Sequence, residues 1–215
     1  MKYLKKFESF DNLESLNEAR VVGFNNPNEG NFVVIAGGPG AGKSFVTGNL
    51  LGLRDFKLVN VDTFREAMAK KLGLDLGDPD DNMKILQMTH TTSDPRNRTV
   101  RHLKQFLSIP KDRKPNIVFD AGGGQTEVMK TVHELAKNIG YETTLVFVKT
   151  DLDTALDRNR QRERTLADEM VVDYHNLVQQ SIDVLKNVFD NVWEVDNSEM
   201  WDHTDRPTDR IEKTK

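Results

Sequence analysis

One stretch of the sequence, Gly37-Gly38-Pro39-Gly40-Ala41-Gly42-Lys43-Ser44, matches the P-loop (Walker A) pattern G-x-x-x-x-G-K-[ST] at every fixed position. The apolar residues 32–36 before it predict a buried parallel strand, and residues 45–51 after it predict the opening of a helix. A strand, a glycine-rich turn and a helix in this order are the context that the pattern requires. The stretch therefore predicts an α/β fold with a phosphate-binding turn.

The residue types in this turn suit the phosphates of a nucleotide. Glycine lets backbone N–H groups turn inward around phosphate oxygens, and the start of a helix adds partial positive charge. Lys43 is expected to reach the β- and γ-phosphates, and the Ser44 hydroxyl is expected to bind Mg²⁺. The alternative, a glycine-rich turn without a ligand, is disfavoured by the complete match. The cofactors are predicted to be ATP and Mg²⁺, and the nucleotide-binding residues are predicted to be Gly38, Pro39, Gly40, Ala41, Gly42, Lys43, Ser44 and Phe45.

The composition limits the classes of protein to consider. A chain of 215 residues suits one α/β domain with appended segments, and a hydrophobic content of 37% leads us to expect some extended or solvated stretches. The sequence has no cysteine, which excludes disulfides, thiolate metal sites and cysteine nucleophiles. No apolar run approaches the ~20 residues that span a bilayer, and charged residues interrupt the first 14 positions where a secretory signal would lie. We therefore expect a cytoplasmic protein without membrane association, and a net charge of −4 gives no overall attraction to nucleic acid.

Apolar and amphipathic stretches alternate along the chain. Further strands are expected at 56–61, 116–120, 143–148 and 191–196, and helices at 63–72, 98–107, 125–138, 151–164 and 168–189. This alternation predicts a three-layer α/β/α P-loop NTPase fold with a mostly parallel five-stranded sheet. The expected divisions are an N-terminal amphipathic segment with its linker (1–30), a P-loop domain (31–196) with an insertion (73–96) and an arginine-rich lid (157–166), and a loosely ordered polar tail (197–215).

An acid and an arginine follow the second strand, at Asp62-Thr63-Phe64-Arg65. Ligands of open α/β sheets bind at the carboxyl ends of strands, so Asp62 is expected to face the γ-phosphate and to accept the proton of an attacking hydroxyl. Arg65, one helical turn further, is expected to clamp an anionic group of an acceptor. The alternative is a helix cap at Asp62 beside a solvated Arg65, and Asp62 can serve in both roles.

Asp120 ends the apolar strand at 116–120 and is followed closely by glycines at 122–124. This is the Walker B position, where an acid binds Mg²⁺ directly or through water. Glycines there leave room for a substrate against the backbone. We therefore predict Ser44 and Asp120 as the metal ligands, and Asp120 and Gly122 with Arg65 as substrate-binding residues. The alternative is a turn without function, since glycine-rich turns often join a strand to a helix.

Four arginines fall within seven residues, at positions 158, 160, 162 and 164. Such a segment cannot form a buried helix face. One interpretation is a solvated helix held by neighbouring acids, where each ion pair contributes about 0.3–0.5 kcal/mol. The other is a lid whose arginines close over ATP, where one arginine can raise the rate of phosphoryl transfer roughly 10³–10⁵-fold. The order of strand, lid and long helix favours the lid, and the predicted catalytic residues are Lys43, Asp62, Arg158 and Arg162.

Together these elements resemble P-loop kinases of the zeta-toxin and polynucleotide-kinase type. The resemblance covers roughly residues 31–190. It rests on the P-loop, on residues 60–65, on Asp120 after its apolar strand, and on Arg158-Asn159-x-x-Arg162. It implies that residues 31–196 form a P-loop kinase domain with an arginine lid.

The resemblance also implies roles for single residues. Asp62 corresponds to the general base, Arg65 to the clamp on the acceptor phosphate, and Arg158 with Arg162 to the lid. Ala-Gly-Gly-Gly follows Asp120 where the family usually has Thr-Asn or Thr-Gly, and the segment 73–96 is unlike the short counterpart in polynucleotide kinases. Zeta-type kinases, which phosphorylate a nucleotide-activated amino sugar, carry longer insertions in this region. These two differences from the family, after Asp120 and at 73–96, leave the identity of the acceptor open but do not affect the predicted nucleotide site.

The N-terminal residues carry a second resemblance. Residues 1–10 are similar to the capsid-targeting peptides of large tailed phages, in which a protease cleaves after a Leu/Ile-x-Glu triplet such as Leu16-Asn17-Glu18. This resemblance implies a phage-encoded protein that is located in the host cytoplasm or packaged in the virion in association with the capsid. The alternative, favoured by the helical spacing of apolar residues alone, is an N-terminal helix packed on the core.

Three functions remain open from the sequence. The first is an ATP-dependent kinase that phosphorylates a hydroxyl group. Its acceptor is expected to be a nucleotide sugar or a nucleoside-like molecule rather than a 5′-hydroxyl nucleic-acid end, because the net charge is acidic and an aromatic stacking stripe is missing. The second is a nucleotide-hydrolysing switch, which does not need a base at Asp62. The third is a packaged virion protein with a P-loop fold, against which the intact Lys43 and Ser44 argue.

Overall fold

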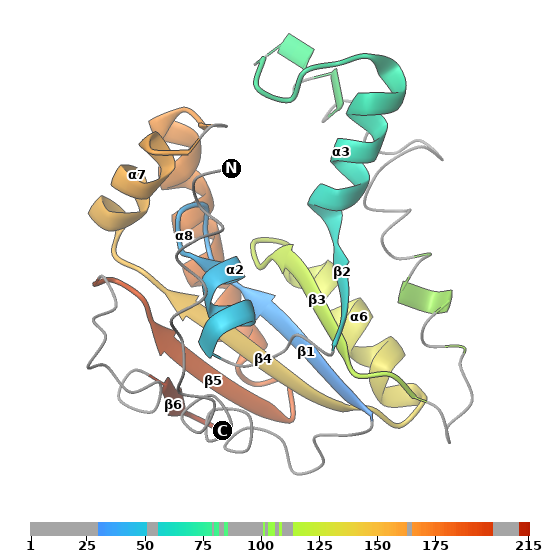
Figure 1. The fold of residues 1–215 in the computed structure, drawn as a ribbon. Coiled ribbons are helices and arrows are strands. Elements are labelled where there is room, and N and C mark those ends of the chain that lie inside the picture. Colours follow the sequence, from blue (N-terminus) through green and yellow to red (C-terminus); the bar gives the residue numbers. More distant parts are fainter. Residues whose placement is uncertain are drawn as a thin grey trace, which may run out of the picture.

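The computed structural model describes residues 30–50, 56–78, 80–81, 84–85, 101, 103–105, 108, 114–162, 165–199 and 211–215. In this part of the chain six strands form one sheet in the order β2-β3-β1-β4-β5-β6 (Figure 1). Their bounds are β1 Asn31–Ala36, β2 Lys57–Asn60, β3 Ile117–Gly122, β4 Glu142–Lys149, β5 Asn191–Asp196 and β6 Ile211–Lys213. The first five strands are parallel and β6 runs antiparallel to β5. The predicted α/β fold with a mostly parallel sheet is confirmed, with β6 as a strand that the sequence did not predict.

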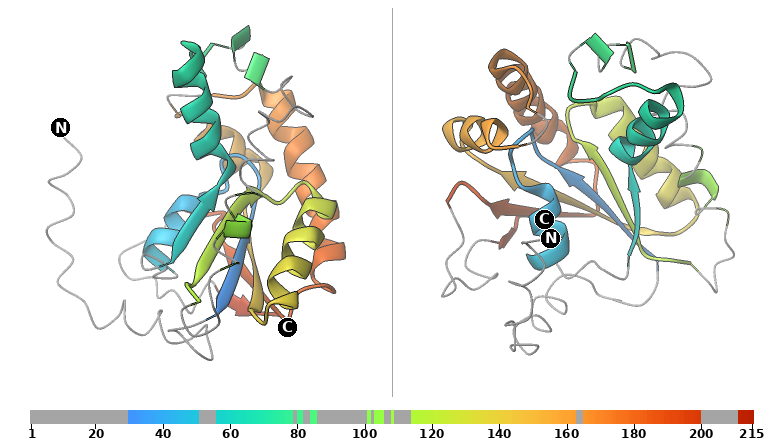
Figure 2. Two further views of the ribbon diagram at one scale, coloured as in Figure 1. Left: turned by 90° about the vertical axis from the view of Figure 1, so that its right-hand side faces the viewer. Right: turned by 45° about the horizontal axis from the view of Figure 1, so that its top comes forward.

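Strand β1 is buried on both faces, which explains its continuous apolar sequence. Phe32 and Val34 point into the larger core cluster, together with apolar side chains of the helices α6 (Thr126–Asn138) and α8 (Asp168–Leu185). Val33 and Ile35 point to the opposite face, where the helices α2 (Lys43–Phe45) and η2 (Val46–Leu50) lie (Figure 2). Fully burying each of these side chains contributes about 1.5–3 kcal/mol. The strand before the P-loop is thus fixed from both sides.

The strand register brings residues of three strands together at the carboxyl ends. Ile35 of β1 pairs with Asp120 of β3, and Asp120 pairs with Asn60 of β2. Helix α3 (Val61–Leu72) rises directly from the end of β2, and α7 (Leu152–Arg160) follows β4 on the other side of β1 (Figure 1). Any ligand of the P-loop therefore lies between α3 and α7.

Residues after 196 contribute to the domain, contrary to the expectation of a loosely ordered tail. Strand β6 pairs with β5 through Ile211 opposite Val195, and the buried Asn197 continues from β5. A strand of three residues with the polar sequence Ile-Glu-Lys has no periodicity to reveal it. The described part of the tail therefore completes the edge of the sheet.

Several predictions concern residues outside the described part of the chain. These include the N-terminal segment with its capsid-targeting resemblance, most of the insertion at 73–96 and most of the helix at 98–107. The described start of the insertion packs Leu74 and Leu76 on a small cluster with Met68, Ala69 and Ile85. Within the described residues, every helix is too short or too polar to cross a membrane.

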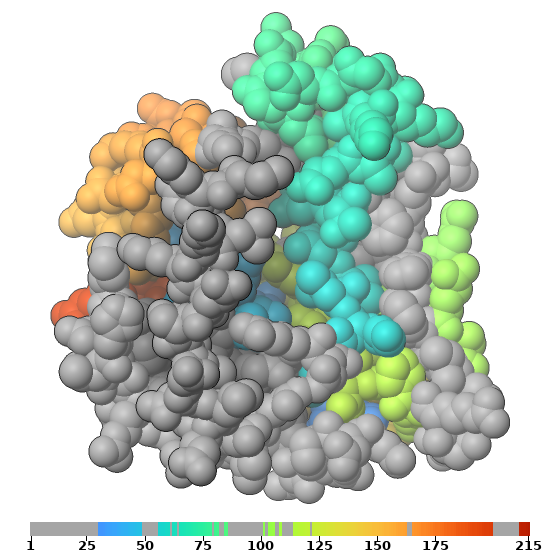
Figure 3. Space-filling model, viewed as in Figure 1, coloured from blue at the N-terminus to red at the C-terminus, as the bar shows by residue number. Residues whose placement is uncertain are grey.

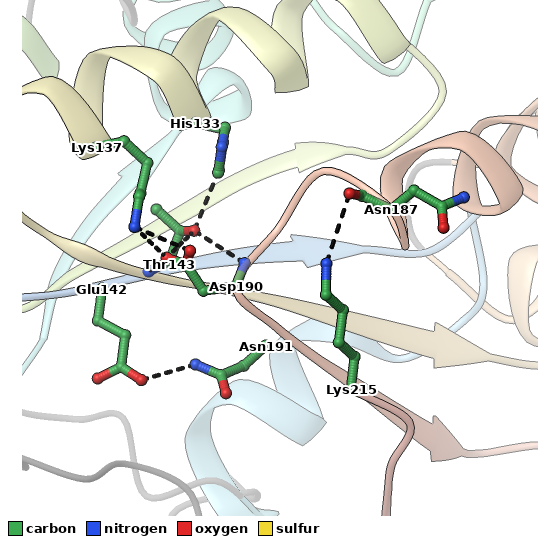
Figure 4. A network of polar contacts seen from close by, with 8 residues as sticks. All are labelled: His133, Lys137, Glu142, Thr143, Asn187, Asp190, Asn191 and Lys215. Atoms are coloured by element: carbon green, nitrogen blue, oxygen red, sulfur yellow. Dashed lines mark hydrogen bonds and ion pairs between the residues drawn. The ribbon is translucent and has the colours of Figure 1, made fainter.

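A polar network joins α6, β4 and the turn before β5 at the end of the sheet away from the P-loop (Figure 4). The Asp190 carboxylate accepts hydrogen bonds from the Thr143 hydroxyl at 2.8 Å and the Thr143 amide at 2.9 Å, and forms an ion pair with Lys137 at 2.9 Å. His133 Nδ1 lies 3.1 Å from the same hydroxyl. Because that hydroxyl gives its one proton to the carboxylate, His133 Nδ1 must be the donor. The network thus holds Asp190 in its charged form and fixes Nδ1 of His133 as a donor.

The charge states of this network predict how stability depends on pH. Burial lowers the pKa of His133 below 6.5, against the opposing charge of Asp190. Burial raises the pKa of Asp190, but the hydrogen bonds from Lys137 and Thr143 outweigh this effect and hold the pKa below 3.8. Both groups bind fewer protons in the folded state, so the free energy of unfolding should fall as the pH drops below 6.5 and fall further below 3.8. Urea unfolding at a series of pH values measures this, and His133→Asn, which keeps a donor but does not titrate, should flatten the upper step.

Asp190→Ala should lower the free energy of unfolding at pH 7 by about 1–3 kcal/mol, because it leaves the buried Thr143 without its acceptor. Asp183→Ala, which removes an exposed acid from α8, is the matched control and should change little. Equal stability of the two variants would show that the network does not stabilise the fold.

Candidate active site

The P-loop adopts a closed turn that only glycine permits at two positions. Gly40 and Gly42 have φ angles of 77° and 82°, in the left-handed region. A Cβ atom on Gly40 would lie 2.2 Å from the carbonyl oxygen of Ala155, so the start of α7 packs directly on the loop. The Ala41 amide closes the turn on the Gly38 carbonyl at 3.2 Å. The loop is therefore shaped by its glycines and held by α7.

Lys43 lies across this loop. Its ammonium donates hydrogen bonds to the carbonyls of Gly37 at 3.0 Å and Gly38 at 3.3 Å. The positive charge is thus held within the turn, on the side where a nucleotide's phosphates are expected. Ser44, the next residue, is exposed in the first turn of the helix. The two P-loop residues predicted to act on phosphate and Mg²⁺ are therefore brought together.

Asp120 lies beside the P-loop at the end of β3, at a buried position. Burial raises the pKa of its carboxyl, the charge of Lys43 lowers it, and the charge of Asp62 raises it. The side-chain amide of Asn60 donates to the Asp120 carboxylate at 3.4 Å. The charges of Lys43 and Asp62 therefore both act on the Asp120 carboxyl.

Asp62 and Arg65 form an ion pair in the first turns of α3. Arg65 Nη1 lies 3.2 Å from Asp62 Oδ1, and the Asp62 side chain is 55% exposed. The residue that caps α3 is Asn60 and not Asp62. The side-chain oxygen of Asn60 accepts a hydrogen bond from the backbone amide of Asp62 at 2.8 Å. The Asp62 carboxylate is therefore not used in capping and is accessible to an acceptor.

The turn after Asp120 is tied to the P-loop. The Gly37 amide donates to the Gly122 carbonyl at 3.1 Å, and a Cβ atom on Gly123 would lie 2.7 Å from the Cβ of Ala36. Gly122 has a φ of 79° and no heavy atom within 4 Å of where its Cβ would be. The glycines thus allow close packing at 123 and leave open space at 122.

Arg158 is bonded to the loop after β5 and lies near the P-loop. Its guanidinium donates to the carbonyls of Asn197 at 2.7 Å and Glu199 at 3.4 Å, and Nη1 is 4.0 Å from where a Cβ on Gly42 would be. Asn197 also donates its side-chain amide to the Ala41 carbonyl at 2.7 Å. Asn197 therefore connects the lid helix to the P-loop.

The other lid arginines differ in their surroundings. Arg160 is paired with Asp168 at 2.6 Å and Asp157 at 3.2 Å, which suits the solvated interpretation for this residue. Arg162 is exposed just beyond the end of α7. The buried Asn159 holds the turn that carries it, since its side chain donates to the Leu166 carbonyl at 2.8 Å and accepts the Leu166 amide at 3.1 Å. Arg158 thus lies within α7 near the P-loop, and Arg162 lies just beyond the end of that helix.

In the space-filling view, residues of β2 and α3 in teal and residues of α7 in orange lie on opposite sides of the molecule (Figure 3). The predicted acceptor-side residues Asp62 and Arg65 come from the α3 side, and Arg158 comes from the α7 side. The sequence predictions missed four asparagine or threonine side chains that fix this arrangement: Asn60, Thr150, Asn159 and Asn197. Of these, Asn60 and Asn159 stand within motifs on which the resemblance rests, but neither was assigned a role.

Loss of the Asn197 side-chain amide should weaken ATP binding. Asn197→Ala removes the 2.7 Å bond to the Ala41 carbonyl and leaves only the bond from Thr150 at 3.2 Å. A buried hydrogen bond of this kind corresponds to about a tenfold change in affinity. Calorimetry with a non-hydrolysable ATP analogue measures the effect, and Asn187→Ala, at the exposed end of α8, is the control. Unchanged affinity in Asn197→Ala would show that the P-loop keeps its shape without this contact.

Comparison with protein families gives a match over most of the chain. Residues 32–184 match the model of a family described as an AAA domain. Among curated protein sequences, none matches this chain significantly.

Solved structures share the fold at low sequence identity. A structure of the PezAT chromosomal toxin-antitoxin system of Streptococcus pneumoniae aligns with a TM-score of 0.53 and 15% identity, over 93% of this chain and 76% of that chain. The AvrRxo1-ORF1:-ORF2 complex with ATP aligns with a TM-score of 0.60 and 17% identity, over 86% of this chain and 58% of that chain. The same complex with sulphate ions aligns with a TM-score of 0.51 and 16% identity, over 86% of this chain and 59% of that chain. At these identities the likeness shows the fold alone, which is the P-loop kinase-like α/β fold, and this chain spans less than two thirds of the AvrRxo1 chain.

Proposed function

The chain belongs to the AAA domain family, and from this membership and its P-loop kinase-like fold we propose that it is an ATP-dependent kinase. It transfers the γ-phosphoryl group of ATP to a hydroxyl group of an acceptor. The observation that carries this proposal is the placement of Asp62, an exposed carboxylate that is paired with Arg65 and whose charge, like that of Lys43, acts on Asp120. A switch that only hydrolyses nucleotide does not need a base in this position.

Each of the proposed catalytic residues has a separate role in phosphoryl transfer. The acceptor oxygen attacks the γ-phosphorus, the bond from that phosphorus to the leaving ADP oxygen breaks, and Asp62 takes the proton of the acceptor hydroxyl. Lys43 and the arginines 158 and 162 stabilise the negative charge on the transferring group. Arg65 holds Asp62 and is near enough to bind an anionic group of the acceptor.

The donor set at the P-loop suits Mg²⁺. Magnesium is bound in such sites by one or two oxygen ligands of the protein together with substrate phosphates. The Ser44 hydroxyl and the Asp120 carboxylate are such ligands, and no group of three or more acids or histidines is gathered anywhere in the described residues to form a separate metal cage. Bound Mg²⁺ would neutralise charge on the β- and γ-phosphates. It would also favour the ionised form of Asp120, which burial alone disfavours.

The acceptor is proposed to be a small molecule of the nucleotide-sugar or nucleoside type, as in zeta-type kinases. The structural likeness to a toxin-antitoxin protein and to a complex that contains ATP supports the fold on which this proposal rests. A 5′-hydroxyl nucleic-acid end is the competing acceptor, and it is included in the test.

The proposal is tested by product analysis with γ-labelled ATP and Mg²⁺. The acceptors are UDP-amino sugars, nucleosides, and 5′-hydroxyl DNA and RNA, and the variants are Lys43→Ala and Asp62→Asn. Label transferred to one acceptor and lost in both variants is the expected result. Release of free phosphate alone, with Asp62→Asn as active as the wild type, would overturn the proposal in favour of a switch.

A further inference from the structure

Two large apolar side chains are exposed on the first half of α8. Tyr174 is 39% exposed and Leu177 is 43% exposed. They are three residues apart, so they are neighbours on the surface of the helix. The opposite face of α8 is buried in the core through Val171, Val178, Ile182 and Leu185. An exposed aromatic and aliphatic pair beside a candidate active site is a feature that packing of the helix does not explain.

This pair lies against the turn that follows Asp120. A Cβ atom on Gly124 would be 3.1 Å from Leu177 Cδ2 and 3.8 Å from Tyr174 Cδ1. Between the two side chains in sequence, the backbone of His175 is 3.7 Å from where a Cβ on Gly38 would be. Tyr174 and Leu177 therefore border both the P-loop and the β3 turn.

The pair lies on the acceptor side of the site. Asp120 lies in β3, and Asp62 lies at the start of α3, which follows β2; both strands are on the side of β1 where Gly124 lies. Arg158 and Asn197 come from α7 and the end of β5 on the other side. Helix α3 and helix α8 stand on either side of the β3 turn (Figure 2). An acceptor whose hydroxyl reaches Asp62 can thus rest its remaining part on Tyr174 and Leu177.

The charges around the pair favour a small acceptor. Glu169 and Asp173 are exposed on the same half of α8, and Asp168 is half-buried in its ion pair with Arg160. Like charges repel a polyanionic strand along this face. The combination of an aromatic ring, an aliphatic side chain and nearby acids suits the ring of a small acceptor rather than a polyanionic strand.

We infer that Tyr174 and Leu177 form the binding platform for the ring of a small acceptor, a nucleoside or a sugar, which stacks on Tyr174 while its hydroxyl faces Asp62. This inference rests on the proposed kinase function for the position of the hydroxyl, but ring binding itself does not require turnover. Replacing an aromatic side chain by alanine removes the stacking on its ring and commonly lowers affinity about tenfold or more.

The test compares variants of one helix. Tyr174→Ala and Leu177→Ala remove the platform, Tyr174→Phe keeps the ring, and Val184→Ala removes an apolar side chain that is 44% exposed ten residues further along α8. Binding of uridine, UDP-N-acetylglucosamine, a 5′-hydroxyl oligonucleotide and glycerol is measured by calorimetry with a non-hydrolysable ATP analogue present. KM for the acceptor and for ATP is measured wherever phosphoryl transfer occurs.

The expected result is that uridine or the nucleotide sugar binds, and that Tyr174→Ala weakens this binding about tenfold without changing KM for ATP. Tyr174→Phe and Val184→Ala should resemble the wild type. Binding of no ring compound, equal effects of Tyr174→Ala and Val184→Ala, or preferred binding of the oligonucleotide would overturn the inference. Ring binding that depends on Tyr174 without any label transfer would overturn the kinase function and leave the platform standing.

Discussion

Arg162→Ala is expected to lower kcat for phosphoryl transfer by about 10³-fold, the lower end of the effect of an arginine that stabilises the transferring group. Of the described lid arginines, Arg158 is bonded to two backbone carbonyls and Arg160 is paired with two carboxylates, whereas Arg162 is exposed at the end of the lid helix. Arg162 is therefore the one that can turn to the γ-phosphate when ATP binds. Because this contact forms in the transition state, KM for ATP should change much less than kcat.

The matched control for Arg162 is Arg160→Ala, which removes the same charge from the same segment. Its loss breaks exposed ion pairs, which contribute little to stability, so kcat should stay within a few-fold of the wild type. Arg158→Ala should lower kcat less than Arg162→Ala and should also raise KM for ATP, because Arg158 is held by two backbone carbonyls near Gly42 of the P-loop. An Arg162→Ala enzyme with wild-type kcat would assign the charge stabilisation to another group.

Asp62→Asn is expected to lower kcat by about 10²–10⁴-fold, the usual contribution of a positioned general base. Asparagine has nearly the same shape and can still accept the hydrogen bond from Arg65, so the ion-pair geometry is largely kept while proton acceptance is lost. Single-turnover rates measured at saturating acceptor separate this loss from any change in binding. Glu66→Gln neutralises an exposed acid four residues along α3 and should leave the rate unchanged. A rate for Asp62→Asn equal to that of Glu66→Gln would exclude Asp62 as the base.

The sequence predicted those parts of the fold that depend on residues close together in the chain. The P-loop and β1 were predictable because six consecutive buried residues and a fixed glycine spacing encode them. The ends of α6 and α8 were predicted within a few residues because their amphipathic faces bury a continuous stripe. Asp120 and Asp62 were predictable as strand-end acids in a parallel sheet, although their roles still await experiment.

What the sequence did not predict depends on contacts between distant residues. Asn197 is separated by 156 residues from the Ala41 carbonyl that it binds, and no local pattern distinguishes it from an ordinary turn asparagine. Strand β6 exists because β5 offers it an edge, and its own three residues are polar and too few to show a period. The cap of α3 falls on Asn60 rather than Asp62, since both residue types favour this position and only the helix start distinguishes them.

The double pairing of β1 has a consequence for how the protein opens. Because β1 hydrogen-bonds to β3 and β4 and is buried on both faces, its amides should exchange with deuterium only when the whole domain unfolds. Strand β2 has four residues and one neighbour, and α3 beyond it packs on a small cluster of its own, so these amides should exchange through partial opening at a lower free energy. The P-loop thus follows the most persistent strand of the molecule, whereas Asp62 and Arg65, which are proposed to meet the acceptor, lie on the helix that is expected to open first.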